Sequence, residues 1–430
     1  MNKFEEFGLS SQLLTAIGRL GFEVPTEIQE KIIPHIIQGK DVIGESSTGS
    51  GKTLAFGCGI IEKTIPDKGL QALILTPTRE LAEQVKKNII EFSYRKNLSI
   101  IAIYGGVGLG QQTTDLRKAD IVIATPGRLL DHYRRKTINL SAIKILVLDE
   151  ADRMLDMGFI VDIEKIINAC PKKRQTLLFS ATIPPRLKLL SKKYLIQPLD
   201  IRTTQYVDPS KLKQVYYNIN KNAKISLMLH LFEENSGLAM VFCNSRKMVD
   251  FVTRNLRANK INAIAIHGGL KQNKRTQIIK SFNDGKAKVL ACTDVAARGL
   301  HIEDVSHIYN YDIPKDPKDY VHRIGRTARA GESGKVVNLL CEYDFDNFSR
   351  LINEYRNFSI DKMETPKVER AFVTREVSSG NPRINGRNRF GRGSSSVGRT
   401  NGRDGFRKSF GKRTSFKSRN NYNNGRNKRW

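Results

Sequence analysis

Short apolar runs rich in β-branched residues alternate with amphipathic stretches of helical length over roughly the first 340 residues of the chain. Each run ends in a polar segment or in one that contains glycine or proline. Runs of this kind, separated by helices, are typical of a parallel sheet covered by helices. In the first half of the chain the predicted strands are 41–44, 72–76, 100–104, 121–124, 145–148 and 176–179.

The series of predicted strands restarts in the second half, at 215–219, 240–243, 263–266, 289–291, 307–311 and 336–340. The segment 197–213 lies between the two series. It is polar, contains two prolines and has little apolar period, as linkers between domains do. The sequence therefore predicts two α/β domains in tandem, residues 1–207 and 208–365, with the boundary near residue 208.

Residues 366–430 have a different composition, dominated by Gly, Arg, Asn and Ser with isolated aromatic side chains. From residue 375 onward this segment holds 16 basic and 2 acidic residues. It has no apolar period and cannot build a core. We predict a disordered basic C-terminal tail.

The whole chain has 72 basic and 43 acidic residues, a net charge of +29, and about half of the excess lies in the tail. A charge of this size favours a polyanionic partner, which is either nucleic acid or an acidic membrane surface. No apolar run approaches the roughly 18 to 20 residues that span a bilayer, and the N-terminus is acidic where a signal peptide is apolar. We expect a cytoplasmic protein that is not inserted in a membrane.

The five cysteines are Cys58, Cys170, Cys243, Cys292 and Cys341. They lie far apart, and no pair has CxxC spacing. This pattern indicates neither a disulfide framework nor a structural metal site. We expect reduced thiols in the core.

The strongest chemical signal is the segment 46–53 (SSTGSGKT), directly after a predicted strand and before an apolar stretch of helical length. Glycines let the backbone N–H groups of such a loop turn toward phosphates, a lysine meets the β and γ phosphates, and the last hydroxyl is offered to Mg²⁺. We therefore predict a nucleotide-phosphate loop. It comprises Ser46, where Gly is usual, and Ser47, Thr48, Gly49, Ser50, Gly51, Lys52 and Thr53.

A second signal is the segment 145–152 (ILVLDEAD), an apolar strand that ends in adjacent acids. The carboxyl ends of strands face the ligand crevice in an open α/β sheet. There Asp149 can hold Mg²⁺ while Glu150 orients and deprotonates the attacking water. Two acids after a strand are often only a solvated edge or a helix cap, but together with the phosphate loop they indicate nucleotide hydrolysis.

These letters and the motifs around them, in order, resemble the DEAD-box RNA helicases over roughly residues 4–340. The resemblance implies two RecA-like domains, each a mainly parallel sheet flanked by helices, with ATP and Mg²⁺ as cofactors and RNA as the partner. Residues 21–29 (GFEVPTEIQ) resemble the Q motif of the family. In that motif Gln29 reads the adenine edge, and upstream Phe4 stacks on the ring.

Three further segments of the first domain resemble the family's RNA-backbone contacts, which suit sequence-independent recognition. Their residues are Pro77, Thr78 and Arg79, then Gly105 and Gly106, then Thr125, Pro126, Gly127 and Arg128. The SAT motif resembles the element that couples hydrolysis to strand separation, and comprises Ser180, Ala181 and Thr182. Each segment alone would pass for a strand-to-helix turn.

In the second domain VFCNS (241–245), QNKR (272–275) and TDVAARG (293–299) resemble the remaining RNA elements, with Gln272, Arg275, Thr293, Arg298 and Gly299 as contacts. The segment 322–329 (HRIGRTAR) resembles the ATP-coupling motif. In this motif His322 and Arg323 are the predicted coupling residues. Arg326 and Arg329 stand at the arginine-finger positions and are predicted catalytic residues.

The chain departs from the family pattern at two positions. His301 stands where the family usually has Asp near the ATP ribose, which puts that contact in doubt, although imidazole still forms hydrogen bonds. A histidine there gives a weak resemblance to the RhlB-like bacterial subgroup of the RNA degradosome. Ala328 replaces a usual Gly, and we expect no consequence.

The combined prediction is an ATP-dependent RNA helicase that opens short duplexes locally or remodels RNA–protein complexes. Ribonucleoprotein or RNA-decay proteins are candidate partners. For the tail we favour an RNA-binding tether over a solubilising extension. Three alternatives stay open: an RNA-binding chaperone or clamp with little turnover, a DNA-directed motor, and, more remotely, a small-molecule P-loop kinase.

Overall fold

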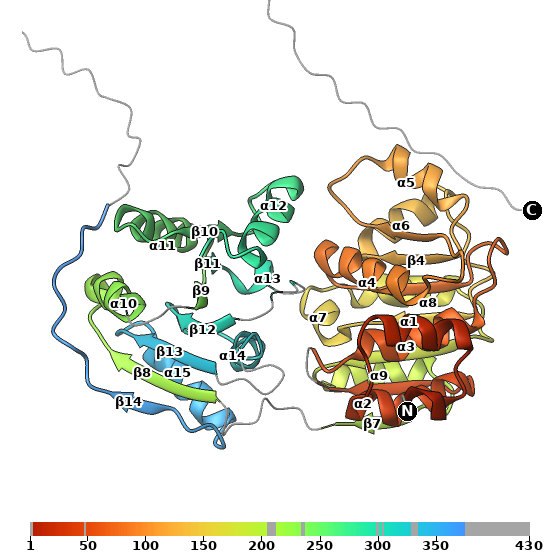
Figure 1. Cartoon of the computed structure of the whole chain (residues 1–430), viewed down its shortest axis with the longest axis horizontal. Coiled ribbons are helices and arrows are strands. Elements are labelled where there is room, and N and C mark those ends of the chain that lie inside the picture. Colours follow the sequence, from red (N-terminus) through yellow and green to blue (C-terminus); the bar gives the residue numbers. More distant parts are fainter. Residues whose placement is uncertain are drawn as a thin grey trace, which may run out of the picture. The chain divides into compact units, whose positions relative to one another are not determined.

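The computed structural model describes residues 3–46, 49–203, 212–233, 237–297, 300, 302, 305–327 and 334–374. Two seven-stranded parallel sheets, each flanked by helices, organise these residues (Figure 1). This confirms the predicted fold class. No helix among the described residues is long and apolar enough to cross a membrane.

The first sheet has the order β3-β4-β2-β5-β6-β1-β7. Its strands are β1 (Val42–Glu45), β2 (Ala72–Leu75), β3 (Ile100–Ile103), β4 (Ile121–Ala124), β5 (Ile145–Leu148), β6 (Gln175–Ser180) and β7 (Leu199–Arg202). Its helices are η1 (Lys3–Phe7), α1 (Ser11–Arg19), α2 (Glu27–Ile37), α3 (Lys52–Lys63), α4 (Arg79–Phe92), α5 (Leu109–Leu116), α6 (Pro126–Arg134), α7 (Ala151–Asp156), α8 (Ile160–Ala169) and α9 (Pro185–Tyr194).

The second sheet has the order β10-β11-β9-β12-β13-β8-β14. Its strands are β8 (Leu212–Asn218), β9 (Leu238–Phe242), β10 (Ala263–Ile266), β11 (Val289–Cys292), β12 (Val305–Asn310), β13 (Gly334–Leu340) and β14 (Asp361–Met363). Its helices are η3 (Lys221–Ala223), α10 (Lys224–Glu233), α11 (Arg246–Ala258), α12 (Gln272–Asn283), α13 (Asp294–Ala297), α14 (Pro317–Ile324) and α15 (Phe345–Glu354).

Each central strand is buried on both faces, which explains why the strands read as continuous apolar runs. In the first sheet Ile74 and Val147 belong to one core cluster, while Leu73 and Leu146 belong to the cluster on the opposite face. The second sheet likewise separates two clusters. All five cysteines are free and buried, as predicted.

One edge strand of each sheet, β7 in the first and β14 in the second, was not predicted. β7 lies inside the segment 197–213, which the sequence assigns to a linker, and pairs with β1. The linker assignment is therefore wrong for residues 199–202, and also for residues 212–213, where β8 begins. Every second residue of β7 is exposed, and all three residues of β14 are exposed, so neither carries the apolar run of a central strand.

Residues 366–374, which the sequence assigns to the tail, form an extended strap on the second domain. Apolar side chains of the strap pack on the second-domain core. The Ala371 N–H donates to Ser226 Oγ at 3.0 Å, and the Thr374 N–H donates to Asn255 Oδ1 at 2.7 Å. The packed chain thus extends at least to residue 374, whereas the predicted tail from 375 to 430 lies outside the described residues.

Candidate functional site

Every predicted motif of the first domain except the Q motif, which precedes β1, follows a strand of one parallel sheet, so these motifs lie at its carboxyl edge. The phosphate loop, the paired acids and the SAT motif follow β1, β5 and β6, which are neighbours in the sheet. The three predicted RNA segments follow β2, β3 and β4, which are also neighbours. Strand order therefore divides the edge into a predicted nucleotide half and a predicted RNA half.

The phosphate loop is held by its glycines and by its own side chains. Gly49 and Gly51 have φ angles of 88° and 91°, in the left-handed region that favours glycine. The Lys52 ammonium donates to the Ser46 carbonyl at 2.7 Å, and the Ser46 and Ser50 hydroxyls lie 2.9 Å apart. Ser47 and Thr48 lie outside the described residues.

Lys52 is the first residue of α3 and is only 8% exposed. Burial lowers the pKa of its ammonium, and the charges of Asp149 and Glu150 oppose that shift. The fold thus places one buried cation among buried acids. Such a cation suits the β and γ phosphates of a nucleotide.

Asp149 and Glu150 follow β5, and both are buried, 3% and 7% exposed. Burial and the charge of Glu150 raise the pKa of Asp149 to about 7. A divalent cation there would balance the crowded negative charge, so the residues fit Mg²⁺, with Thr53 beside Lys52 as the hydroxyl ligand. Mg²⁺ commonly needs only one or two protein ligands, and no cluster of three His, Cys, Asp or Glu suited to a metal occurs in the described part of the chain.

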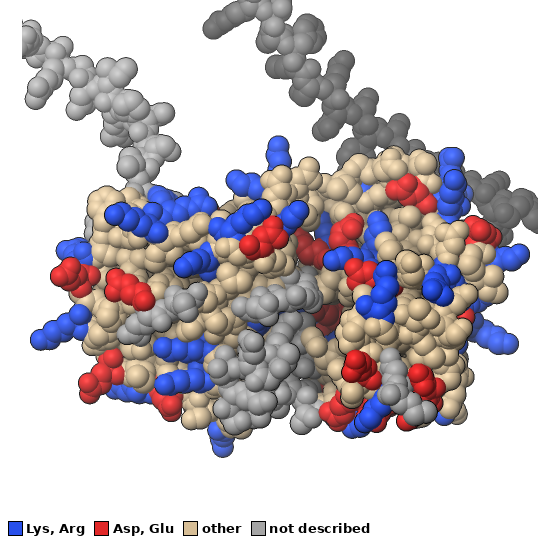
Figure 2. All heavy atoms as spheres, viewed as in Figure 1, with Lys and Arg blue, Asp and Glu red and all other residues tan. Residues whose placement is uncertain are grey.

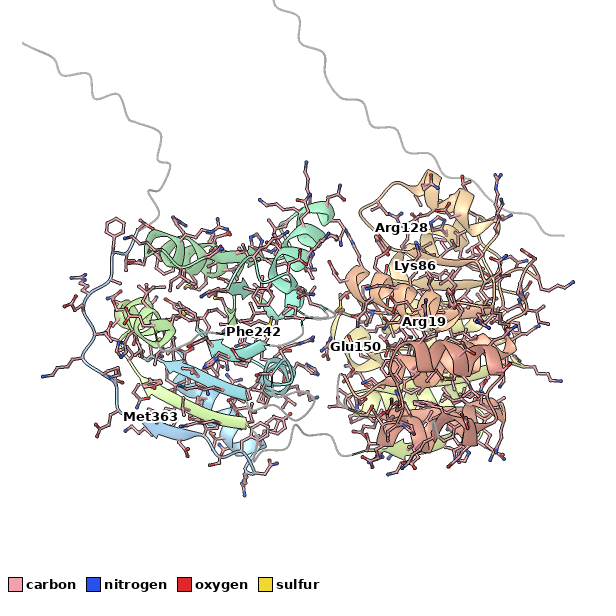
Figure 3. All side chains as sticks on the ribbon, viewed as in Figure 1. Arg19, Lys86, Arg128, Glu150, Phe242 and Met363 are labelled. Carbon is pink, nitrogen blue, oxygen red and sulfur yellow. The ribbon has the colours of Figure 1, made fainter. Side chains whose placement is uncertain are left out.

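Glu150 is the N-cap residue of α7 and has a φ of 50°, a left-handed conformation that is uncommon for a residue with a side chain (Figure 3). Its carboxylate accepts from Arg153 NH1 at 2.7 Å, and Arg153 is 1% exposed. The sequence reasoning missed Arg153. The available signal was its spacing, because a residue three positions after Glu150 shares its face of a helix.

The SAT motif is hydrogen-bonded directly to the segment with the acids. Asp152 Oδ2 accepts from the Thr182 N–H at 3.0 Å and from the Thr182 hydroxyl at 3.1 Å. The Asp152 N–H donates to Ser180 Oγ at 3.2 Å. The ends of β5 and β6, with Ala181 between the two hydroxyl residues, are therefore joined in one network.

The Q-motif glutamine, Gln29, contacts the phosphate loop. The Gln29 amide donates to the Gly51 carbonyl at 3.1 Å, accepts from the Thr26 N–H at 2.9 Å, and fills the space that a Cβ at Gly51 would need. Phe4 is fully buried and packs edge-to-face on Phe7 at 5.8 Å between ring centroids. The adenine contacts of Gln29 and Phe4 stay predictions.

The RNA half of the first domain forms one contiguous set. Thr78 caps α4 by accepting from the Leu81 N–H, and the next residue, Arg79, lies against Gly106. Arg128, on α6, donates to the Val107 carbonyl at 3.1 and 3.2 Å (Figure 3). Pro77, Gly105, Thr125, Pro126 and Gly127 lie in the same three segments.

In the second domain Arg323 is a buried hub, 1% exposed. It donates to both carboxylate oxygens of Asp294 at 2.6 and 2.8 Å and to Asn244 Oδ1 at 3.1 Å. A bidentate pair of this kind is strong and specific in orientation. Arg323 thereby ties together three predicted motifs, those that contain Asn244, Asp294 and Arg323 itself.

The remaining predicted residues of the second domain lie as follows. Arg326 is 4% exposed and donates to the Leu300 carbonyl at 2.7 Å. Arg275 is buried and donates to the Ala296 carbonyl at 3.3 Å. Gln272 begins α12, Thr293 follows β11, and His322 lies on α14. Arg298, Gly299, His301, Ala328 and Arg329 lie outside the described residues.

Comparison with protein families agrees with this arrangement. The family model described as DEAD/DEAH box helicase matches residues 26–190, and the one described as helicase conserved C-terminal domain matches residues 221–331. The solved structure of S. cerevisiae Dbp5 bound to RNA and ADP BeF3 has a TM-score of 0.76 and 30% identity, covering 85% of this chain and 96% of that chain. A DEAD box protein from Methanococcus jannaschii is 39% identical, with a TM-score of 0.53, and covers 84% of this chain and 98% of that chain.

Two similar proteins, from different bacteria, are both named CshA. The ATP-dependent RNA helicase CshA of Listeria monocytogenes is 42% identical over 378 residues, which are 87% of this chain and 72% of that protein. The DEAD-box ATP-dependent RNA helicase CshA of Bacillus subtilis is 41% identical over 372 residues, 86% of this chain and 75% of that protein. With its two sheets, its nucleotide edge and this identity over most of its length, the chain belongs to the DEAD-box ATP-dependent RNA helicases.

Proposed function

We propose that this helicase uses ATP hydrolysis to separate short RNA duplexes locally or to remodel RNA–protein complexes. One observation carries the proposal: the buried Lys52, Asp149 and Glu150 converge at the nucleotide half of a sheet edge whose other half holds the RNA segments. A hydrolytic centre and an RNA surface on one rigid sheet suit an RNA-gated ATPase.

Within the first domain each buried group has a distinct role. Lys52 binds the β and γ phosphates, Thr53 and Asp149 hold Mg²⁺, and Glu150 takes the proton of the attacking water. Mg²⁺, when bound, draws charge from the phosphate oxygens and so lowers the barrier to hydrolysis. The Arg153 guanidinium restrains the Glu150 carboxylate at 2.7 Å and orients it.

The second domain contributes guanidinium groups to the proposed nucleotide site. Arg326 and Arg329 supply guanidinium groups to the γ-phosphate, as arginine fingers do. Arg323 acts through other residues, because its guanidinium is engaged by Asp294 and Asn244. His322 and the SAT motif couple hydrolysis to RNA, and the three hydrogen bonds between Asp152 and the SAT hydroxyl residues support that role.

RNA lies along the strand-end loops, contacted through phosphate and ribose without sequence reading. Closing of the two domains on ATP and RNA bends the bound strand so that its complement cannot stay paired, and phosphate release resets the enzyme. We place this activity in the cytoplasm, with ribonucleoprotein or RNA-decay proteins as partners. The RhlB-like subgroup suggested by His301 stays a prediction.

The test is steady-state ATP hydrolysis by the full-length protein with no nucleic acid, with saturating single-stranded RNA, and with DNA of matched sequence. We expect strong stimulation by RNA alone. Lys52→Ala and Glu150→Gln should abolish turnover while the far-ultraviolet circular dichroism spectrum stays that of wild type.

The other outcomes separate the alternatives. Equal stimulation by DNA would indicate a general nucleic-acid motor, and RNA binding without hydrolysis would indicate a clamp. Wild-type hydrolysis rates in either variant would contradict the assignment of the site.

A further inference from the structure

A buried glutamine connects the RNA segments of the first domain. Gln112 lies on α5 and is 6% exposed. Its amide nitrogen donates to the Tyr104 carbonyl at 3.2 Å, at the start of the glycine loop. Its amide oxygen accepts from Arg128 NH1 at 3.0 Å. One side chain therefore spans the loops that follow β3 and β4.

The connection reaches the third segment through the glycine loop. Arg128 also donates to the Val107 carbonyl at 3.1 and 3.2 Å. Arg79, from the segment after β2, packs against Gly106, where any side chain would collide with the guanidinium. The RNA segments after β2, β3 and β4 thus form one contact chain with Gln112 at its buried end.

A buried histidine is hydrogen-bonded to this glutamine. His132, on α6, is fully buried, and its Nε2 lies 3.2 Å from the Gln112 amide oxygen. Because that oxygen already accepts from Arg128 and the amide nitrogen donates to Tyr104, the amide cannot be flipped. Nε2 must therefore carry the proton and donate.

The other ring nitrogen is then an acceptor. The Thr137 hydroxyl lies 2.8 Å from His132 Nδ1 and 3.0 Å from the His132 carbonyl, and in this tautomer its single proton goes to Nδ1. Burial and the nearby Arg128 charge lower the pKa of His132, so the neutral ring is favoured. All polar atoms of Gln112 and His132 are thereby satisfied inside the domain.

We infer that Gln112 and His132 are positioning residues for RNA, which hold the Arg128 guanidinium and the glycine loop in the geometry that meets the RNA backbone. The inference rests on the proposed RNA-contact role of Arg79, Gly106 and Arg128. Preorganised contacts lower the ordering cost of binding, so the loss of either residue weakens RNA affinity without removing a contact group.

The matched pair of variants is Gln112→Leu and Gln71→Leu. Gln71 is also buried, 2% exposed, and its amide nitrogen donates to the Ile65 and Gly69 carbonyls at 2.7 and 3.1 Å. It precedes β2 and so lies at the amino edge of the sheet, away from the RNA segments. The two substitutions remove similar buried hydrogen bonds at opposite edges.

The experiment measures the RNA concentration for half-maximal stimulation of ATP hydrolysis, kcat at saturating RNA, and direct RNA binding by fluorescence anisotropy. For Gln112→Leu we expect the RNA concentration for half-maximal stimulation and the Kd for RNA to rise about tenfold, which corresponds to about 1.4 kcal/mol of binding free energy. The value of kcat at saturating RNA should stay within about twofold of wild type. Gln71→Leu should leave both RNA constants unchanged. His132→Phe should behave like Gln112→Leu, and His132→Gln, which retains a donor, should restore most of the affinity.

The outcomes are distinguishable. Wild-type RNA affinity in Gln112→Leu, or an equal loss in Gln71→Leu, would overturn the inference alone. A wild-type protein that binds no RNA would overturn the proposed function and the inference together. Nitrogen-15 chemical shifts of His132, assigned by its loss in His132→Gln, should report the Nε2–H tautomer, and an Nδ1–H tautomer would overturn the network.

Discussion

The carboxyl group of Asp149 is buried beside a second carboxylate, which raises its pKa to about 7. In the unfolded chain its pKa is about 3.9. Between about pH 4 and pH 7 the unfolded state therefore releases a proton that the folded state retains. The contribution of Asp149 to the free energy of unfolding, measured without nucleotide or Mg²⁺, therefore falls as pH rises through this window.

Asp149→Asn should remove this component. At pH 8 we expect the variant to be more stable than wild type, and the difference in the free energy of unfolding should shrink as pH falls through this window. Urea unfolding across this pH range measures both values. The exposed Asp200 on β7 supplies the control, and a similar gain in Asp200→Asn would show that general charge reduction is responsible.

The Arg153–Glu150 ion pair gives a second residue-level prediction, because its two side chains are only 1% and 9% exposed. Arg153→Ala leaves a buried carboxylate without its partner, which costs about 3–5 kcal/mol of stability. Hydrolysis should also fall, since Glu150 loses its restraint. Thermal and urea unfolding measure the first effect, and kcat measures the second.

The control for that variant is an ion pair of similar length at the surface. Lys193 and Glu164 lie 2.8 Å apart, with side chains 61% and 34% exposed. Lys193→Ala should cost far less stability than Arg153→Ala, because water screens the exposed pair. Equal losses in the two variants would mean that burial does not determine the strength of the Arg153 pair.

At the scale of elements, the strap of residues 366–374 extends the second domain beyond β14. Asn255 is fully buried on α11, and its side chain joins the strap by accepting from the Thr374 N–H. Asn259, one turn later, donates to the Phe372 carbonyl at 2.9 Å. The strap thus satisfies polar groups of α11 that would otherwise need water or other partners.

Truncation tests this role of the strap. A chain that ends at residue 374 should have the thermal midpoint of the full-length protein, whereas one that ends at residue 365 should unfold at a lower temperature. Asn255→Ala should cost about 1–3 kcal/mol through the unpaired backbone groups that it leaves. An unchanged midpoint in the shorter chain would show that the strap adds nothing to stability.

At the scale of the whole molecule, the two sheets share one topology, in which β8 corresponds to β1 and α10 to α3. Lys224 begins α10 as Lys52 begins α3. The Lys224 ammonium, however, is paired with the Asp344 carboxylate and the Tyr311 carbonyl, each at 2.6 Å. In the second domain the Asp344 carboxylate thus balances the charge of Lys224. In the first domain we propose that nucleotide phosphate balances the charge of Lys52.

The charge of the whole chain is divided between folded part and tail. On the face that Figure 2 shows, basic side chains of the described residues are interspersed with acidic ones and form no continuous patch. The segment 375–430 adds 16 basic residues in a sequence with no apolar period. We therefore expect this segment to carry much of the nonspecific RNA affinity.

Deletion of residues 375–430 should weaken RNA binding and flatten its dependence on salt, because each phosphate contact on a single strand contributes about −0.7 to the slope. RNA-stimulated hydrolysis should persist. A full-length variant with serine at these 16 basic positions separates charge from chain length. An unchanged salt slope in both would favour a solubilising role for the segment.

The central strands, the phosphate loop and the paired acids were predictable because each leaves a local signal. A strand buried on both faces must be apolar throughout, as 121–124 and 145–148 are, and these two bounds match β4 and β5. A phosphate loop needs glycines at fixed spacing before a lysine. These features depend on residues that are neighbours in the sequence. The fold class and the family resemblance could therefore be predicted from the amino-acid sequence alone.

The contacts between residues far apart in the sequence could be found only in the three-dimensional structure. Arg153 restrains Glu150, Asp152 joins the SAT motif, and Gln112 joins loops after two different strands. Such contacts arise from strand order and burial, which have no signature in the local sequence. The same reason explains the edge strand β7 and the strap, because pairing and packing with distant residues hold them in place where their own composition does not.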